Sequence, residues 1–322
     1  MNRLTLKILV VIAMIAGNAS LYFVDGEKYY FAFTSMRILG TMIIPVITFL
    51  MVEGYYHSTN RKMYFVRLAA FAFAAESAYL YYTNMVMDKI DKAISANIAS
   101  MTAAGEKVVD MSSKDFRYEK AIADIGHKLG TTAQNYYATL YDSANILYFS
   151  CGLMSLTAGF LLICCIGIYR KKFAEKRTSF AIVTILTVLG FALFTAFSEA
   201  STEILVYSLI FYFFREKKSA KTVVSFMAAV ILLPFSGMVY IVGAAIGSFL
   251  VMLYKEEKAE PEKPKTKQEM FKERTGMAKK KKADADRYVK IPGRMNKWLR
   301  IAFYAAYPLH YIVFCMIIYF GK

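Results

Sequence analysis

A histidine in the middle of an apolar stretch is the residue best suited to chemistry in this sequence. His310 lies within residues 298–320, three positions after Tyr307 and two after Pro308. A neutral imidazole can act as a general base near neutral pH. Pro308 has no amide hydrogen, so it bends a helix and frees the carbonyl four residues earlier. We therefore predict His310 as a candidate base with Tyr307 one helical turn away. The alternative is an uncharged histidine that packs against a tyrosine.

Two charged residues, Arg37 and Glu76, lie inside other apolar stretches. A charge at membrane depth is costly, so such a residue predicts a functional site and a partner. We expect Arg37 and Glu76 to pair across neighbouring helices, either as a structural pair or beside a polar cavity. Arg67 precedes Glu76 by nine residues and therefore lies on the opposite helix face, which predicts that its side chain reaches the cytoplasmic interface. Three residues share the helix face of Arg37: Thr41, Pro45 and Thr48.

The other histidines and the cysteines are less informative. His57 ends the second apolar stretch and is the second candidate for proton transfer, whereas His127 lies in a polar segment and reads as a surface residue. The sequence has no Gly-rich phosphate loop, no His-Glu-x-x-His, no Cys-x-x-Cys and no Gly-x-Ser-x-Gly. All four cysteines lie in apolar stretches: Cys151, Cys164, Cys165 and Cys315. We therefore expect no metal site and no disulfide framework.

The composition indicates which elements must position these residues. Of 322 residues, 57% are hydrophobic and 20% are charged, below the average charged share of about 25%. The apolar residues form blocks of roughly 20, the length that crosses a membrane as a helix. This excludes a soluble or disordered chain and predicts an all-α, polytopic transmembrane helix bundle. The nine expected spans are 6–24, 31–52, 63–86, 144–169, 178–197, 201–214, 222–235, 237–254 and 298–320.

Two of these stretches allow another interpretation. Residues 6–24 begin like a signal peptide, but the apolar residues that resume at 21–24 lengthen the block to a span. Residues 222–254 could form one kinked helix. That length exceeds even a tilted span, and the sequence Pro-Phe-Ser-Gly at 234–237 is typical of a turn, so we predict a hairpin.

The distribution of basic residues predicts the orientation. The chain has 40 basic and 24 acidic residues, a net charge of +16. Basic residues cluster near residues 3–7, 61–62, 170–177 and 215–221, and the short connections between these regions have few. Because cytoplasmic loops are enriched in Lys and Arg, this places the N-terminus inside and the C-terminus outside. The basic residues around 255–282 lack interleaved aromatic residues, which argues against nucleic-acid binding.

Polar segments divide the chain into five parts. Residues 1–86 contain the first three spans, 144–254 the next five and 298–322 the last. Residues 87–143 carry helical periodicity and predict an extracytoplasmic helical insert. Residues 255–297 are rich in Lys, Glu and Pro and predict a cytoplasmic linker, either a solvated tether or a segment attracted to anionic membrane lipids.

Three segments together resemble the TraX family, multipass proteins named for the acetylase of conjugative pilin. Residues 37–68 are similar to the family's run of Pro and Phe, Glu-Gly, His-Thr-x-Asn and Tyr-x-x-Arg-Leu. Residues 145–152 resemble its next span, and 303–310 resemble its closing Tyr-Pro-x-His span. The family's first span usually carries Asp-His, but Gly17 and Asn18 stand here. Its Gly-Arg pair becomes Gly40-Thr41, with Arg37 one helical turn earlier.

The resemblance implies a multi-pass acyltransferase of the cell membrane. It would transfer an acetyl group from acetyl-CoA to an envelope acceptor, which could be a pilin-like protein, a lipid or a glycan. His310 would be the base, oriented by Tyr307 or Glu76, and Arg37 would stabilise developing negative charge. Basic residues on the cytoplasmic side would attract the phosphates of acyl-CoA: Arg61, Lys62 and Arg67. Two alternatives remain open: a non-catalytic scaffold or assembly protein of the envelope, which the missing Asp-His favours, and a small-solute transporter.

Overall fold

The computed structural model describes residues 1–26, 28–103, 151–196, 200–254 and 297–320, together with residues 123 and 134. Within these residues the regular structure is entirely helical and contains no strand. This confirms the all-α prediction. The helices of the described residues are α1 (Arg3–Phe23), α2 (Tyr30–His57), α3 (Arg61–Ala103), α6 (Gly152–Lys172), α7 (Arg177–Thr195), α8 (Ser201–Phe213), α9 (Lys218–Ile231), α10 (Leu233–Met252) and α13 (Lys297–Phe320).

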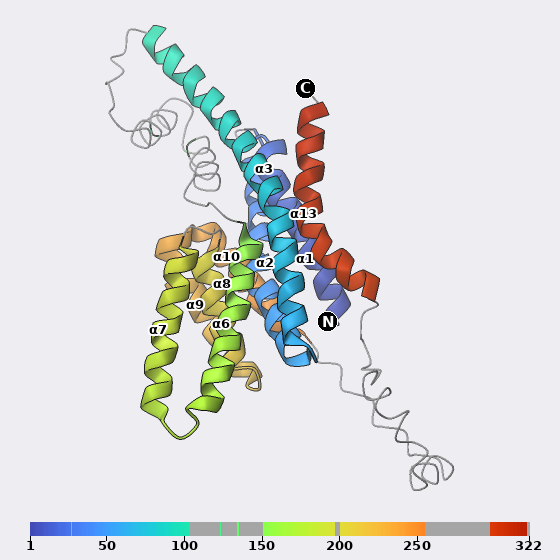
Figure 1. Ribbon diagram of the computed structural model, residues 1–322. Helices are drawn as coiled ribbons and strands as arrows, with labels where there is room; N and C mark the ends of the chain where they lie inside the picture. The colour runs from blue at the N-terminus through green and yellow to red at the C-terminus, as the bar shows by residue number, and fades with distance from the viewer. Residues whose placement is uncertain are drawn as a thin grey trace.

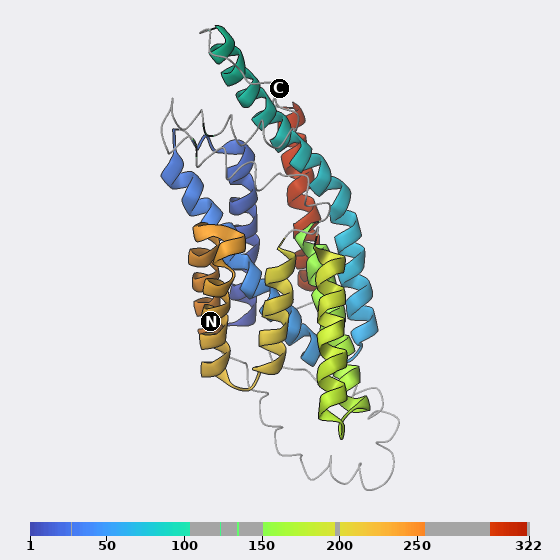
Figure 2. The ribbon, with the colours of Figure 1, turned by 90° about the vertical axis from the view of Figure 1, so that its left-hand side faces the viewer.

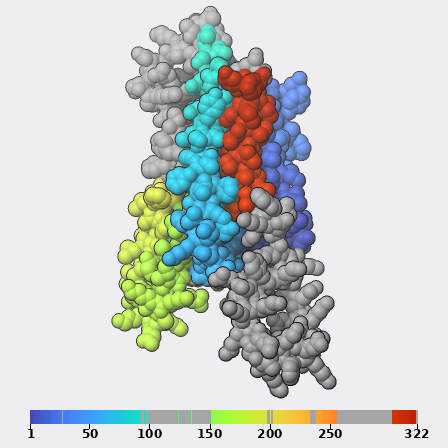
Figure 3. Space-filling model, turned by 45° about the vertical axis from the view of Figure 1, so that its right-hand side comes forward, coloured from blue at the N-terminus to red at the C-terminus, as the bar shows by residue number. Residues whose placement is uncertain are grey.

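The helices form an up-and-down bundle. Figures 1 and 2 show that the connections α2–α3, α6–α7 and α8–α9 gather at one end of the bundle, whereas α1–α2 and α9–α10 connect at the other end. On another face, α13 lies between α3 and α1 (Figure 3). Elements far apart in the sequence are therefore neighbours, and the last helix packs against the first and third.

Five helical stretches of the described residues are long and apolar enough to cross a membrane: α1, α2, α6, α7 and residues 301–320 of α13. Helices α8 and α9 contain only 13 and 14 residues, fewer than the roughly 20 that a membrane-spanning helix needs. The chain therefore has the helices of a membrane protein. The count of nine spans and their orientation stay predictions.

The predicted hairpin near Pro234 is confirmed. Helix α9 ends at Ile231 and α10 begins at Leu233, with Pro234 in its first turn. Proline fits there because the first amide groups of a helix have no partner within the helix. The two helices then run side by side (Figure 2). Residues 222–254 are accordingly not one long helix.

Helix α3 extends beyond its predicted span of 63–86. It is one helix of 43 residues up to Ala103, so the first part of the predicted insert 87–143 continues the span. Beyond the apolar part, Asp88 accepts a hydrogen bond from Lys92 at 2.6 Å, which raises the pKa of Lys92. Apart from residues 123 and 134, residues 104–150 lie outside the described residues, as do His127 and residues 255–296 of the predicted linker.

Glycines let α2 approach two neighbours closely. Gly17 of α1 faces Gly40 of α2, and a Cβ at Gly17 would collide with the Gly40 Cα. On the other side of α2, a Cβ at Gly243 or Gly247 of α10 would collide with the α2 backbone or with Thr41. Small residues at such positions let helix backbones pack tightly in membrane proteins. Helix α2 is therefore held between α1 and α10.

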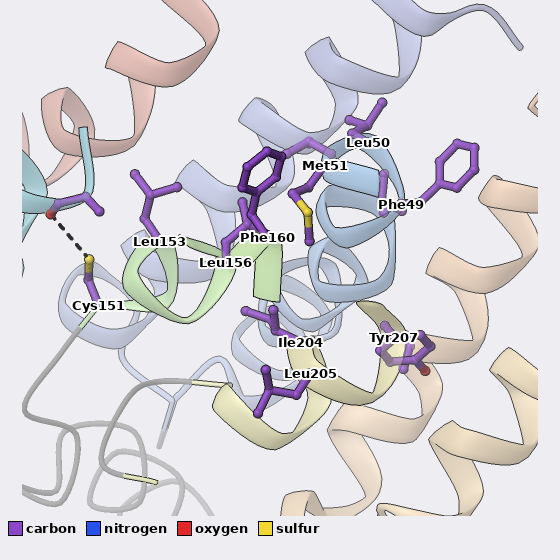
Figure 4. Packing of buried hydrophobic residues seen from close by; sticks show 14 of the residues in the cluster. Phe49, Leu50, Met51, Cys151, Leu153, Leu156, Phe160, Ile204, Leu205 and Tyr207 are labelled. Carbon is purple, nitrogen blue, oxygen red and sulfur yellow. Dashed lines mark hydrogen bonds between the residues drawn. The ribbon is translucent and has the colours of Figure 1, made fainter. Parts of the chain in front are cut away.

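A compact hydrophobic core joins α2, α6 and α8 (Figure 4). Phe49 of α2 packs edge-to-face against Phe211, with ring centroids 5.6 Å apart, and Phe160 of α6 packs against Tyr64 at 4.7 Å. The core extends to Cys151, the residue just before α6. There the Cys151 thiol donates to the Ala72 carbonyl of α3 at 3.8 Å (Figure 4).

Candidate functional site

The structure brings His310 of α13 against Asn18 of α1. His310 is only 5% exposed. Its Nδ1 lies 3.2 Å from the Ala306 carbonyl oxygen, and its Nε2 lies 3.1 Å from the Asn18 side-chain nitrogen. A carbonyl oxygen can only accept a hydrogen bond, so Nδ1 carries the proton and Nε2 accepts from the Asn18 amide. The ring is thus a neutral imidazole with its basic nitrogen directed at α1.

Two further polar side chains join this pair from α2 and α3. The Tyr82 hydroxyl of α3 donates to the Asn18 carbonyl oxygen at 2.5 Å. Arg37 of α2 reaches the Gly17 carbonyl oxygen, next to Asn18, at 3.5 Å. We call Asn18, Arg37, Tyr82 and His310 the His310 cluster. It joins four helices that are widely separated in the sequence.

Aromatic rings enclose the imidazole on α13 itself. The His310 ring lies 3.9 Å from the Tyr311 ring and 5.6 Å from the Tyr307 ring, centroid to centroid. Tyr307 meets it edge-to-face, as expected for residues one helical turn apart. The predicted proximity of Tyr307 and His310 is confirmed, whereas a catalytic role for either residue stays a prediction.

Glu76 has a partner at the start of another helix. Its Oε2 accepts a hydrogen bond from the backbone amide of Cys151 at 3.2 Å. Cys151 is the N-cap residue of α6, and its own side chain provides no cap. A carboxylate at this position satisfies a free amide and interacts favourably with the positive end of the helix dipole. Glu76 therefore anchors α6 on α3, and the expected pairing of Glu76 with Arg37 stays a prediction.

His57 belongs to a second cluster at the opposite end of α2. Its Nε2 lies 3.0 Å from Glu53 Oε2, and Arg215 Nε lies 3.5 Å from Glu53 Oε1. His57 is 20 residues from Arg37, which corresponds to about 30 Å along a helix. The predicted catalytic residues are consequently not assembled in one site: His57 is distant from the His310 cluster.

A small pocket opens beside Glu53. Its cavity volume is about 40 Å³. Charged, polar and apolar side chains from α2, the α8–α9 connection, α9 and α10 line it, and we call it the basic pocket: Phe49, Glu53, Arg215, Lys218, Lys221, Thr222, Val251, Met252 and Tyr254. The Arg215 guanidinium lies 4.1 Å from the centroid of the Tyr56 ring, and Lys221 Nζ lies 4.7 Å from that of Phe49. Both cations are thereby held in place by aromatic rings.

The three residues expected to attract acyl-CoA lie at the start of α3 and do not line the basic pocket. Arg61 stacks over the Tyr55 ring at 4.1 Å, and Lys62 is exposed. Arg67 donates to the Met63 carbonyl at 3.1 Å, so its side chain points back toward the first turn of α3. That direction agrees with the predicted reach of Arg67 to the interface. A role of any of these residues in binding acyl-CoA stays a prediction.

The sequence left several of these residues unrecognised. Asn18 was noted only as a departure from a family pattern, and Tyr82 was one of 24 tyrosines. The Glu53–His57 contact had a visible signal, because residues four apart on a helix are neighbours. Among the described residues, no group of three His, Cys, Asp or Glu side chains could hold a metal ion.

Comparison with known proteins gives one partial match. A stretch of 89 residues is 34% identical to the "Probable fimbrial assembly protein FimC, serogroup H1" of Dichelobacter nodosus. The matched stretch covers 27% of this chain and 34% of that protein, so about a third of the relative's length is spanned. No family model matches the chain, and no solved structure matches it.

Proposed function

We propose that the protein is a multi-pass acyltransferase of the cell membrane that moves an acetyl group from acetyl-CoA to an amine or hydroxyl of an envelope acceptor. The observation that supports this most directly is the geometry of His310. The Nδ1–H···O=C contact with Ala306 fixes the neutral tautomer and leaves Nε2 as the basic atom. A positioned imidazole of this kind is the commonest general base in enzymes.

In this proposal Nε2 of His310 takes the proton of the acceptor as the acceptor attacks the acetyl carbonyl. The thioester C–S bond then breaks, and coenzyme A leaves as the thiol after its sulfur takes the proton from His310. In the resting protein the Asn18 amide donates to Nε2 at 3.1 Å, so the incoming N–H or O–H group replaces the amide. The acetyl oxygen gains negative charge during the attack. A guanidinium near that oxygen lowers the barrier, and Arg37, which reaches the Gly17 carbonyl next to Asn18, is the cation we assign to it.

The proposal includes a membrane arrangement. The chain would cross the cell membrane nine times, with its N-terminus inside and its C-terminus outside. The gathering of the α2–α3, α6–α7 and α8–α9 connections at one end of the bundle supports this arrangement, because these connections hold basic runs and basic loops remain in the cytoplasm.

The experiment measures transfer of label from radiolabelled acetyl-CoA into membranes that overproduce the protein. His310→Ala is compared with Cys315→Ala, which removes a weak contact of the same helix with α3, the Cys315 thiol to the Ala78 carbonyl at 3.9 Å. Turnover is expressed per folded protein. We expect His310→Ala to lose at least about 100-fold, as for removal of a general base, and Cys315→Ala to retain wild-type turnover. Wild-type turnover in His310→Ala would remove this residue from the mechanism.

A second candidate function is a non-catalytic role in assembling envelope structures. The name of the partial relative, a probable fimbrial assembly protein, favours it. So does Asn18, because its amide and His310 form a satisfied pair that stabilises α1 on α13 without any substrate. Binding of acetyl-CoA to the purified protein distinguishes the two functions: an acyltransferase binds it, and an assembly protein that carries out no transfer does not need to.

A further inference from the structure

The basic pocket has more positive than negative charge. Arg215, Lys218 and Lys221 face it with one carboxylate, Glu53, so its formal charge is +2. Lys221 is only 7% exposed and Glu53 only 5%. Burying a cation costs free energy unless opposite charge compensates for it. Glu53 contacts His57 and Arg215, and its charge also interacts with that of Lys221. Among the lining residues, positive charge therefore exceeds negative charge, which favours an anion in the pocket.

The backbone at the start of α9 adds to the positive charge of the basic pocket. Helix α9 begins at Lys218, and no side chain caps its first turn at Lys217. Lys218 and Lys221 of that turn line the pocket, together with Thr222 just after it. The free amide groups at a helix N-terminus attract anions, phosphate above all. The helix end therefore adds to the attraction that the three cations have for an anion. The three cations remain the principal observation.

The size of the pocket limits what can enter it. A cavity volume of about 10–15 Å³ is enough for one water molecule. The pocket volume of about 40 Å³ therefore has room for a group about as large as three water molecules. A phosphate group fits, and a nucleoside does not. Phe49, Val251 and Met252 form the apolar part of the wall, against which the rest of a phosphate ester can lie.

We propose that the basic pocket binds the phosphate group of a phosphate ester or diphosphate. The group would be held by Arg215, Lys218 and Lys221, with Glu53 keeping Arg215 oriented. Either a soluble nucleotide such as coenzyme A or the headgroup of an anionic lipid carries this chemistry. The proposal does not depend on the acyltransferase function: a protein that binds phosphate here and transfers no acetyl group would support the pocket and overturn that function.

The test is calorimetric titration of the full chain, in nanodiscs of phosphatidylcholine, with pyrophosphate. We expect Lys218→Gln and Lys221→Met each to weaken binding about tenfold, the loss of one charge-assisted contact. Lys218 is exposed, so its replacement leaves the fold intact even if Lys221→Met does not. Lys217→Gln is the matched control: it removes an exposed charge from the same connection but not from the pocket lining, and we expect unchanged affinity.

Two further arms identify the source of the phosphate. Tighter binding of coenzyme A than of pyrophosphate, lost in Lys218→Gln, supports a soluble ligand. Competition by nanodiscs that contain phosphatidic acid, again lost in Lys218→Gln, supports a lipid headgroup. Absence of pyrophosphate binding in phosphatidylcholine nanodiscs overturns the proposal. So does an equal loss in Lys217→Gln and Lys218→Gln, because that result indicates a diffuse surface charge and no pocket.

Discussion

Removing the Asn18 amide and the His310 imidazole, singly and together, measures the contact on which the candidate site depends. Asn18→Ala leaves Nε2 of His310 without its donor, and His310→Ala leaves the amide without its acceptor. Both partners are neutral, the bond is 3.1 Å long, and it is partly buried, with His310 only 5% exposed. Hydrogen bonds between membrane helices average about 0.6 kcal/mol in double-mutant cycles, with a maximum near 1.7. We expect a coupling of about 1 kcal/mol.

The assay is reversible unfolding in mixed micelles, with the free energy of unfolding measured for the wild type and the three variants. The single variants are expected to cost about 1 kcal/mol for Asn18→Ala and about 2 kcal/mol for His310→Ala, which also loses its contact with the Tyr311 ring. A parallel cycle of Asn18→Ala with Tyr82→Phe is the control. Tyr82 bonds the backbone of Asn18 and not its side chain, so this cycle should show no coupling. Additive effects of Asn18→Ala and His310→Ala would refute the proposed contact.

Three further predictions concern packing, capping and topology. Gly17→Ala should destabilise the protein by about 1–3 kcal/mol, because its Cβ collides with Gly40. Gly190→Ala, which faces open space on α7, is the control and should be neutral or slightly stabilising. The same unfolding assay compares the two variants, and equal effects would contradict the α1–α2 packing. Glu76→Ala should lower the free energy of unfolding by about 1 kcal/mol, because it removes the cap of α6. Faster hydrogen exchange confined to the first turn of α6 would identify the cause. Unchanged exchange there would argue against the cap. Reporter fusions at residues 60, 173 and 218 should report the cytoplasm and a fusion at residue 115 the outside, and a cytoplasmic signal at 115 would overturn the nine-span arrangement.

The sequence predicted helices well wherever an apolar stretch had charged or turn-forming ends. The predicted ranges 201–214 and 298–320 each differ from α8 and α13 by one residue at one end, and Pro234 correctly indicated a break. The end of α3 was missed because hydrophobicity changes near residue 86 while the helix does not stop. No glycine or proline occurs between Arg61 and Ala103, so the local backbone has no reason to leave the helical conformation.

The candidate site was predictable only in part. His310 and Arg37 could be found because a polar or charged side chain within an apolar helix is costly without a partner. The identity of the partner depends on how helices rotate about their own axes and pack, which no local pattern specifies. Asn18 therefore emerged as the partner of His310 only in three dimensions. The same reason explains why the contact of Glu76 with the start of α6 was not foreseen, while its expected pairing with Arg37 stays a prediction.

The position of Tyr82 on α3 gives this helix the proportions of a balanced lever. Tyr82 is the middle residue of Arg61–Ala103, with 21 residues on either side, and each arm is about 31 Å long at the rise of an α-helix. Its hydroxyl ties the midpoint to α1. If α3 tilts as a rigid rod about that tie, a sideways push at Ala103 displaces Arg61 by a similar distance in the opposite direction. A force applied to the far end of α3 would thus displace both of its ends, while the hydrogen bond from Tyr82 to the Asn18 carbonyl oxygen remains the pivot.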